Sequence, residues 1–140
     1  MNLEDLAAIE EIKQLKGRYL RLMDQRKWDE WSEVFTDDVR MRVTISGKEY
    51  HSLQGRGVVV STVRSLNVDN RSIHHGHMPE IRLTSPTTAI GVWALWDTYV
   101  DSLGGRSDNY GYYEDNHVIE NGAWKIRSVT CDLFPAPLNA

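Results

Sequence analysis

The sequence has a single cysteine and lacks any long apolar run or basic stripe. One thiol excludes an internal disulfide, and Cys131 lies in a strand-like run, where a cysteine is typically a small core residue. No apolar run approaches the roughly 20 residues of a membrane span. A net charge of -4 argues against nucleic acid as a partner. The first residues, Met1 to Asp5, are acidic where an export signal would be basic, so we expect a cytoplasmic protein.

Several catalytic motifs are also missing. The chain contains no glycine loop of the Walker or dinucleotide type, no serine between paired glycines, and no HExxH. These absences argue against nucleotide-dependent chemistry, an esterase-type nucleophile and a metalloprotease-type zinc site. The sequence therefore offers no motif of its own for a nucleotide cofactor or for a zinc ion of that type.

The size and composition indicate one domain over residues 1–140. Charged residues make up 26% and hydrophobic residues 41%, as in ordinary globular proteins. A chain of 140 residues is long enough to bury a core and to leave a cavity of ligand size.

The first third of the chain predicts helices. Apolar residues recur every three or four positions over residues 3–27, with Asn2 as a plausible N-cap. A shorter helix is expected over 29–36, capped by Asp29, and a third over 58–66.

The remaining segments predict strands. Alternating residues indicate strands over 39–45, 49–53, 73–84, 89–100, 110–120 and 123–133. Asn121-Gly122 and Ser46-Gly47-Lys48 are hairpin signals, residues 101–109 read as a mobile loop near a pocket mouth, and a short tail should follow Pro135-Ala136-Pro137. The fold class is α+β, with helices packed on a strongly curved antiparallel sheet.

Three histidines, His74, His75 and His77, open one of the long strands. Imidazole titrates nearest neutrality, which suits a general base, and we assign that role to His74. Surface tracts, metal ligands and hydrogen-bonded structural residues are the alternatives. A metal site is disfavoured because His74 and His75 point to opposite faces of a strand.

The strand over 89–100 is apolar on both faces but contains Asp97. A carboxyl group in such a setting is costly to bury, has a raised pKa, and can act as a general acid; a strand-end aspartate in solvent is the alternative. Trp93 and Tyr99 share its face and are candidate substrate-binding residues. In the next strand Tyr112 and Asn116 are further candidates, although the sequence leaves open whether their face or that of Tyr113 and His117 points inward.

These residues together resemble the SnoaL-like branch of the NTF2-like superfamily over nearly the whole chain. The matching features are the opening helix with Tyr19 and Asp24, the segment from Trp28 through Phe35 to Val39, the Ile73-His74-His75-Gly76 strand start, and the hairpin from Asn121 to Ile126. The chain looks similar to the scytalone dehydratases, bile acid 7α-dehydratases and lindane dehydrochlorinases of this branch, which act without a cofactor.

The resemblance implies an Asp24/His74 dyad, with Tyr19 and Asp97 as further catalytic residues. The dehydrochlorinases differ at Tyr19 and Asp97, and the segment from Asp97 to Tyr99 replaces a second histidine of the scytalone dehydratases. The expected function is a dehydratase, a lyase that removes a proton next to a carbonyl and eliminates water. Abundant Trp and Tyr favour a ring-shaped, largely apolar substrate. Together with the resemblance, this leads us to expect a hydroxylated cyclic ketone, polyketide or steroid-like molecule.

Two rival functions remain open. A ketosteroid-type isomerase would use the same pocket but return the proton to another carbon. A non-catalytic ligand-binding or assembly subunit would not need Asp24 or His74. The resemblance also implies a homo-oligomer, a trimer or else a dimer.

Overall fold

The structure, a computed structural model, describes residues 1–135. The tail expected after Pro135 lies outside the described residues. The elements in chain order are α1 (Leu3–Asp24), α2 (Trp28–Ser32), β1 (Phe35–Ile45), β2 (Lys48–Gln54), α3 (Arg56–Leu66), β3 (Asn70–Ser85), β4 (Thr88–Asp101), β5 (Arg106–Glu120) and β6 (Ala123–Leu133).

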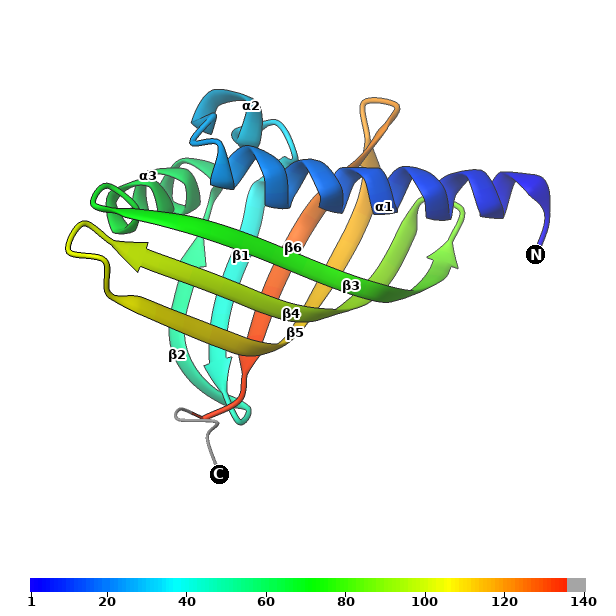
Figure 1. The fold of residues 1–140 in the computed structure, drawn as a ribbon. Helices are drawn as coiled ribbons and strands as arrows, with labels where there is room; N and C mark the ends of the chain where they lie inside the picture. Colours follow the sequence, from blue (N-terminus) through cyan, green and yellow to red (C-terminus); the bar gives the residue numbers. More distant parts are fainter. Residues whose placement is uncertain (136–140) are drawn as a thin grey trace.

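One six-stranded sheet, in the order β2-β1-β6-β5-β4-β3, carries the helices on its concave face. The long strands β3, β4 and β5 curve beneath α1, while α2 and α3 lie near the C-terminal end of that helix (Figure 1). This arrangement confirms the α+β cone. No helix within residues 1–135 is long and apolar enough to cross a membrane.

The sequence predicted a wholly antiparallel sheet. The structure differs in one place, because β1 pairs with β6 in parallel. Helix α3 and the strands β2, β3, β4 and β5 lie between β1 and β6 in the chain, so this pair has no hairpin connection. The other four strand pairs are antiparallel, and the predicted two-residue turn at Asn121-Gly122 joins β5 to β6.

Several predicted boundaries need correction. Helix α1 ends at Asp24 rather than residue 27, because Arg26 has a positive φ of 61°. Asp29 is not a cap: α2 starts at Trp28 after Lys27, which makes no side-chain cap. The expected mobile loop over 101–109 is a short turn, because β4 and β5 extend into it and Asp101 Oδ1 accepts hydrogen bonds from the backbone N–H groups of Leu103 and Gly105.

The N-terminal cap of α1 is as predicted. Asn2 Oδ1 accepts a hydrogen bond from the Asp5 backbone N–H at 2.8 Å, and Asp5 Oδ2 accepts one from the Asn2 N–H at 3.1 Å. This capping box stabilises the first turn and fixes the start of the helix.

The core between helices and sheet is rich in aromatic side chains. Trp31 is fully buried, its ring centroid lies 4.8 Å from that of Phe35, and its Nε1–H donates to the Tyr19 carbonyl at 3.0 Å. This hydrogen bond ties α2 to the end of α1, so Trp31 holds in place the helix turn that presents Tyr19 and Asp24.

We expect Trp31→Ala to lower the free energy of unfolding by about 3–5 kcal/mol, because it leaves a large cavity in the core. Chemical denaturation measures the change. Leu103→Ala, at a fully exposed position, is the control and should change stability by less than about 0.5 kcal/mol. Equal effects of the two substitutions would contradict this account of the core.

Candidate active site

Asp24 and His74 form the centre of the site. Asp24, the last residue of α1, accepts hydrogen bonds from the His74 backbone N–H at 2.8 Å and from its ring Nδ1 at 2.6 Å. A carboxylate only accepts hydrogen bonds, so Nδ1 carries the ring proton and Nε2 has the free lone pair. The pair thus has the geometry of an oriented general base.

The Nε2 side of His74 faces Tyr99 and Asp97. The Tyr99 hydroxyl lies 3.0 Å from Nε2 and Asp97 Oδ2 lies 3.8 Å from it. Burial raises the pKa of the Tyr99 phenol, which therefore stays protonated and donates to the ring nitrogen. A basic nitrogen, a phenol and a second carboxyl group converge at one point.

Asp97 is buried and also accepts hydrogen bonds from the Tyr113 hydroxyl, at 3.0 Å and 3.3 Å to its two oxygens. Burial raises the pKa of the Asp97 carboxyl, against the opposing influence of His74, the Tyr113 hydrogen bond and Lys16. The alternative of a strand-end aspartate in solvent is therefore excluded. The geometry thus places beside the base a carboxyl group that holds its proton more tightly than an ordinary aspartate does.

A cavity of about 290 Å³ lies beside these groups. Its polar wall includes His74, Asp97, Tyr99, Tyr19 and Tyr113, and the lining is completed by Met23, Met41, Val43, Val63, Leu66, Asn67, Asn109, Cys131 and Leu133. Burial raises the pKa of the Cys131 thiol to about 12, which keeps it neutral. The site is a mostly apolar chamber with a small number of polar side chains in its lining, as in small-molecule sites.

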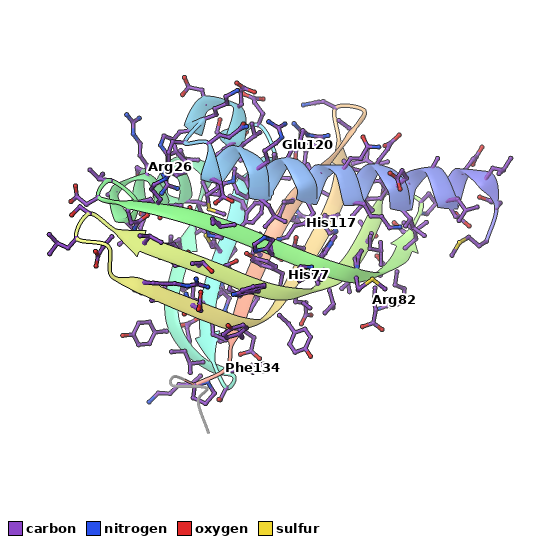
Figure 2. All side chains as sticks on the ribbon, viewed as in Figure 1. Arg26, His77, Arg82, His117, Glu120 and Phe134 are labelled. Atoms are coloured by element: carbon purple, nitrogen blue, oxygen red, sulfur yellow. The ribbon has the colours of Figure 1, made fainter. Side chains whose placement is uncertain are left out.

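Hydrogen bonds from Ser72 to Asp24 and from Arg26 to Ser72 hold the Asp24 carboxylate in position. The Ser72 hydroxyl donates to Asp24 Oδ1 at 2.9 Å and accepts from Arg26 Nη1 at 2.8 Å. Arg26 Nη2 also donates to the Asn70 backbone carbonyl and side chain, at 2.8 Å and 2.9 Å. Arg26 lies near the C-terminal end of α1 (Figure 2), so the turn after the helix is tied to the start of β3.

A β-bulge determines which histidine faces the pocket. Ile81 pairs with Gly91, but beyond the irregularity between His77 and Glu80 the register shifts, so that His74 pairs with Asp97. Met78, in the bulge, has a positive φ of 42°. A one-residue shift exchanges the faces of a strand, so without it His75 would lie opposite Asp97.

The structure brings together five of the eight predicted site residues: Tyr19, Asp24, His74, Asp97 and Tyr99. Trp93 lies on the inward face, but its buried ring packs in the core 5.8 Å from the ring of His117 and does not line the cavity. Its predicted substrate contact is therefore wrong for the cavity as formed.

Tyr112 and Asn116 lie on the other side of the sheet. Tyr112 is 49% exposed and packs on Phe134, while the exposed Asn116 donates to Ser128 Oγ. Tyr113, Asp115 and His117 are the buried set of β5. The two predicted substrate contacts are corrected because the opposite face of β5 points inward.

The sequence interpretation missed Arg26, Ser72 and Tyr113. Arg26 lies just after the end of α1, close in sequence to Asp24, and this proximity was a weak signal for its role. Tyr113 lies on a face of β5 that the alternating pattern could not assign as inward or outward. Among residues 1–135, no group of three or more His, Cys, Asp or Glu side chains is placed to hold a metal ion.

Comparison with known proteins identifies related sequences and folds. The profile of the SnoaL-like domain matches residues 4–130. A predicted scytalone dehydratase from Novosphingobium aromaticivorans superimposes with a TM-score of 0.82 at 20% identity, over 93% of this chain and 86% of that chain. A type 3 hexachlorocyclohexane dehydrochlorinase, LinA, from Novosphingobium barchaimii gives 0.78 at 18% identity, over 95% and 90%.

A protein of another kind has the same fold. The beta subunit of a predicted aromatic-ring-hydroxylating dioxygenase from Novosphingobium aromaticivorans gives a TM-score of 0.80 at 17% identity, over 96% of this chain and 94% of that chain. At these identities the superpositions establish the fold, and the choice between functions depends on the side chains of the site.

The environment of Asp97 predicts a pH-dependent difference in stability. A carboxyl pKa that folding raises contributes stability below the unfolded value of about 3.9, and this contribution is lost as the pH rises through the folded value. We expect Asp97→Asn, which cannot ionise, to gain stability relative to the wild type from acidic to neutral pH. Denaturation across that range measures the trend, and a difference independent of pH would contradict it.

Proposed function

The chain belongs to the SnoaL-like domain family, and on this premise we propose that it is a cofactor-independent lyase acting on a hydroxylated cyclic ketone. The reaction would remove a proton next to the carbonyl and eliminate water. The observation that carries the proposal is the Asp24–His74 pair, whose unprotonated Nε2 lies at a cavity wall beside a buried carboxyl group.

The first step is proton removal. His74 Nε2 takes the proton from the carbon next to the carbonyl, and the electron pair moves to the carbonyl oxygen. Asp24 stabilises the imidazolium that forms, through the hydrogen bond at Nδ1. Tyr99, which donates to Nε2 in the free protein, turns its hydroxyl to the developing oxyanion, and Tyr19 is a second phenol on the same wall.

The second step is loss of the hydroxyl group. Protonated Asp97 gives its proton to the departing hydroxyl, the carbon–oxygen bond breaks, and the electron pair of the enolate forms the carbon–carbon double bond. Water and an unsaturated ketone are the products. The imidazolium then returns its proton to Asp97 across the 3.8 Å between Nε2 and Oδ2, which restores both groups.

The lining also constrains the substrate. No Lys or Arg is among the described residues that line the cavity, which favours a neutral substrate over a carboxylate or a phosphate. The volume, about 290 Å³, is at the lower end for small-molecule sites, and favours one or two rings over four.

The test is a panel of neutral one- and two-ring hydroxy ketones, with product mass measured by mass spectrometry. We expect the wild type to release water from at least one member, and His74→Ala and Asp24→Asn to lower kcat about 10²- to 10⁴-fold. His77→Ala is the matched control, because this exposed histidine of the same strand should leave turnover unchanged.

The outcomes separate the functions. Products of unchanged mass with a shifted double bond would indicate an isomerase. Turnover that persists in His74→Ala would exclude the dyad as the base. Binding of ketones by the wild type without exchange of the proton next to the carbonyl would support a non-catalytic binding subunit.

A further inference from the structure

A buried ion pair lies behind the pocket wall. Lys16 Nζ of α1 lies 2.9 Å from Asp115 Oδ2 of β5, and the two side chains are 1% and 0% exposed. His117 Nε2 lies 3.7 Å from the same Asp115 oxygen, and His117 is seen between α1 and the sheet (Figure 2). Removing an ammonium group from water costs several kcal/mol, and hydrophobic residues could fill this space without that cost.

The ammonium group of Lys16 also contacts two tyrosines of the cavity. Nζ lies 3.8 Å from the ring centroid of Tyr113 and 4.0 Å from that of Tyr19, and the two rings are nearly perpendicular, with centroids 6.0 Å apart. A cation over an aromatic face is attracted by the negative face of the ring. Lys16 is therefore wedged between the two phenols, and Asp115 fixes its position.

The phenol of Tyr113 connects this ion pair to the reacting groups. Its hydroxyl donates to Asp97, and Asp97 lies 3.8 Å from the basic nitrogen of His74. A continuous series of contacts therefore runs from Asp115 through Lys16, Tyr113 and Asp97 to His74.

We propose that Lys16 is a positioning residue for the acid of the site, holding the Tyr113 ring so that its hydroxyl donates to Asp97. The assignment of Asp97 as the acid rests on the proposed lyase function, whereas the contacts of Lys16 do not. The ammonium group of Lys16, which contacts the rings of Tyr19 and Tyr113, also stabilises negative charge that develops on a substrate near these phenols.

The electrostatics of Asp97 agree with this role. Burial raises its pKa, whereas the charge of Lys16 is among the influences that lower it. The titratable or charged groups that interact with Asp97 come from α1, β3, β4, β5 and β6: Lys16, Tyr19, Asp24, His74, Tyr99, Tyr113 and Cys131. Without Lys16, Asp97 should hold its proton to a higher pH.

The main test compares the wild type with the double variant Lys16→Met/Asp115→Asn. Lys16→Met alone would leave an uncompensated buried carboxylate and threaten folding, whereas removing both charges of a buried pair is often neutral for stability. We expect the folded double variant to show Asp97 titrating at higher pH by carbon-13 NMR of its carboxyl group, and kcat to fall about tenfold with KM nearly unchanged. Lys13→Met, at an exposed position of α1, is the matched control.

Tyr113→Phe shows whether Lys16 acts through the phenol. This variant keeps the ring and removes the hydroxyl that donates to Asp97. If Lys16 works by orienting that hydroxyl, Tyr113→Phe should raise the Asp97 titration midpoint by a smaller amount in the double variant than in the wild type. Full additivity of the two effects would overturn the proposed route.

The NMR titration needs no substrate, so the two proposals can fail separately. An unchanged Asp97 titration in the folded double variant would overturn the role of Lys16. An upward shift in a protein whose wild type turns over no ketone would support the role of Lys16 and reject the lyase reaction.

Discussion

The hydrogen bonds between Asp24 and His74 are the constraint on which the site depends. One carboxylate accepts both the backbone N–H and the ring Nδ1 of His74, so the end of α1 and the start of β3 are joined at the reacting group. This contact requires α1 to end at Asp24, the chain to reverse at Arg26, and Ser72 to complete the carboxylate's hydrogen bonding. Trp31 supports the same region by binding the Tyr19 carbonyl. The packing of α2, α1 and β3 therefore acts to orient one imidazole.

The elements that the sequence predicted well are those with a strong local signal. The capping box at Asn2, the long strands and the Asn121-Gly122 turn follow from residue chemistry over a few positions. The parallel pairing of β1 with β6 has no such signal, because it joins segments far apart in the chain. The inward orientation of His74 depends on the bulge near Met78, which alternation alone does not predict. His74 was assigned as the base from the chemistry of imidazole, and the family resemblance supplied its pairing with Asp24.

Two of the three errors at the site, Tyr112 and Asn116, have one physical origin. Alternation divides β5 into two faces but does not say which is inward, and choosing Tyr112 and Asn116 placed two candidates on the outer surface. The inward face instead supplies Tyr113 and Asp115. Lys16 lies on the apolar stripe of α1, where a lysine is unusual, and an aspartate on an inward strand position is equally unusual. Two opposite charges at buried positions are the sequence signal that could have been used.

The central claim is that Asp24 fixes the His74 tautomer so that Nε2 is the base facing the cavity. Nitrogen-15 NMR of the histidine rings, at a pH where the His74 ring is neutral, tests it directly and requires no substrate. The account predicts that His74 Nδ1 carries the proton and that Nε2 has the chemical shift of an unprotonated nitrogen accepting a hydrogen bond, with the pattern lost in Asp24→Asn. A proton on Nε2 in the wild type would leave no basic nitrogen facing the cavity, and would contradict the account.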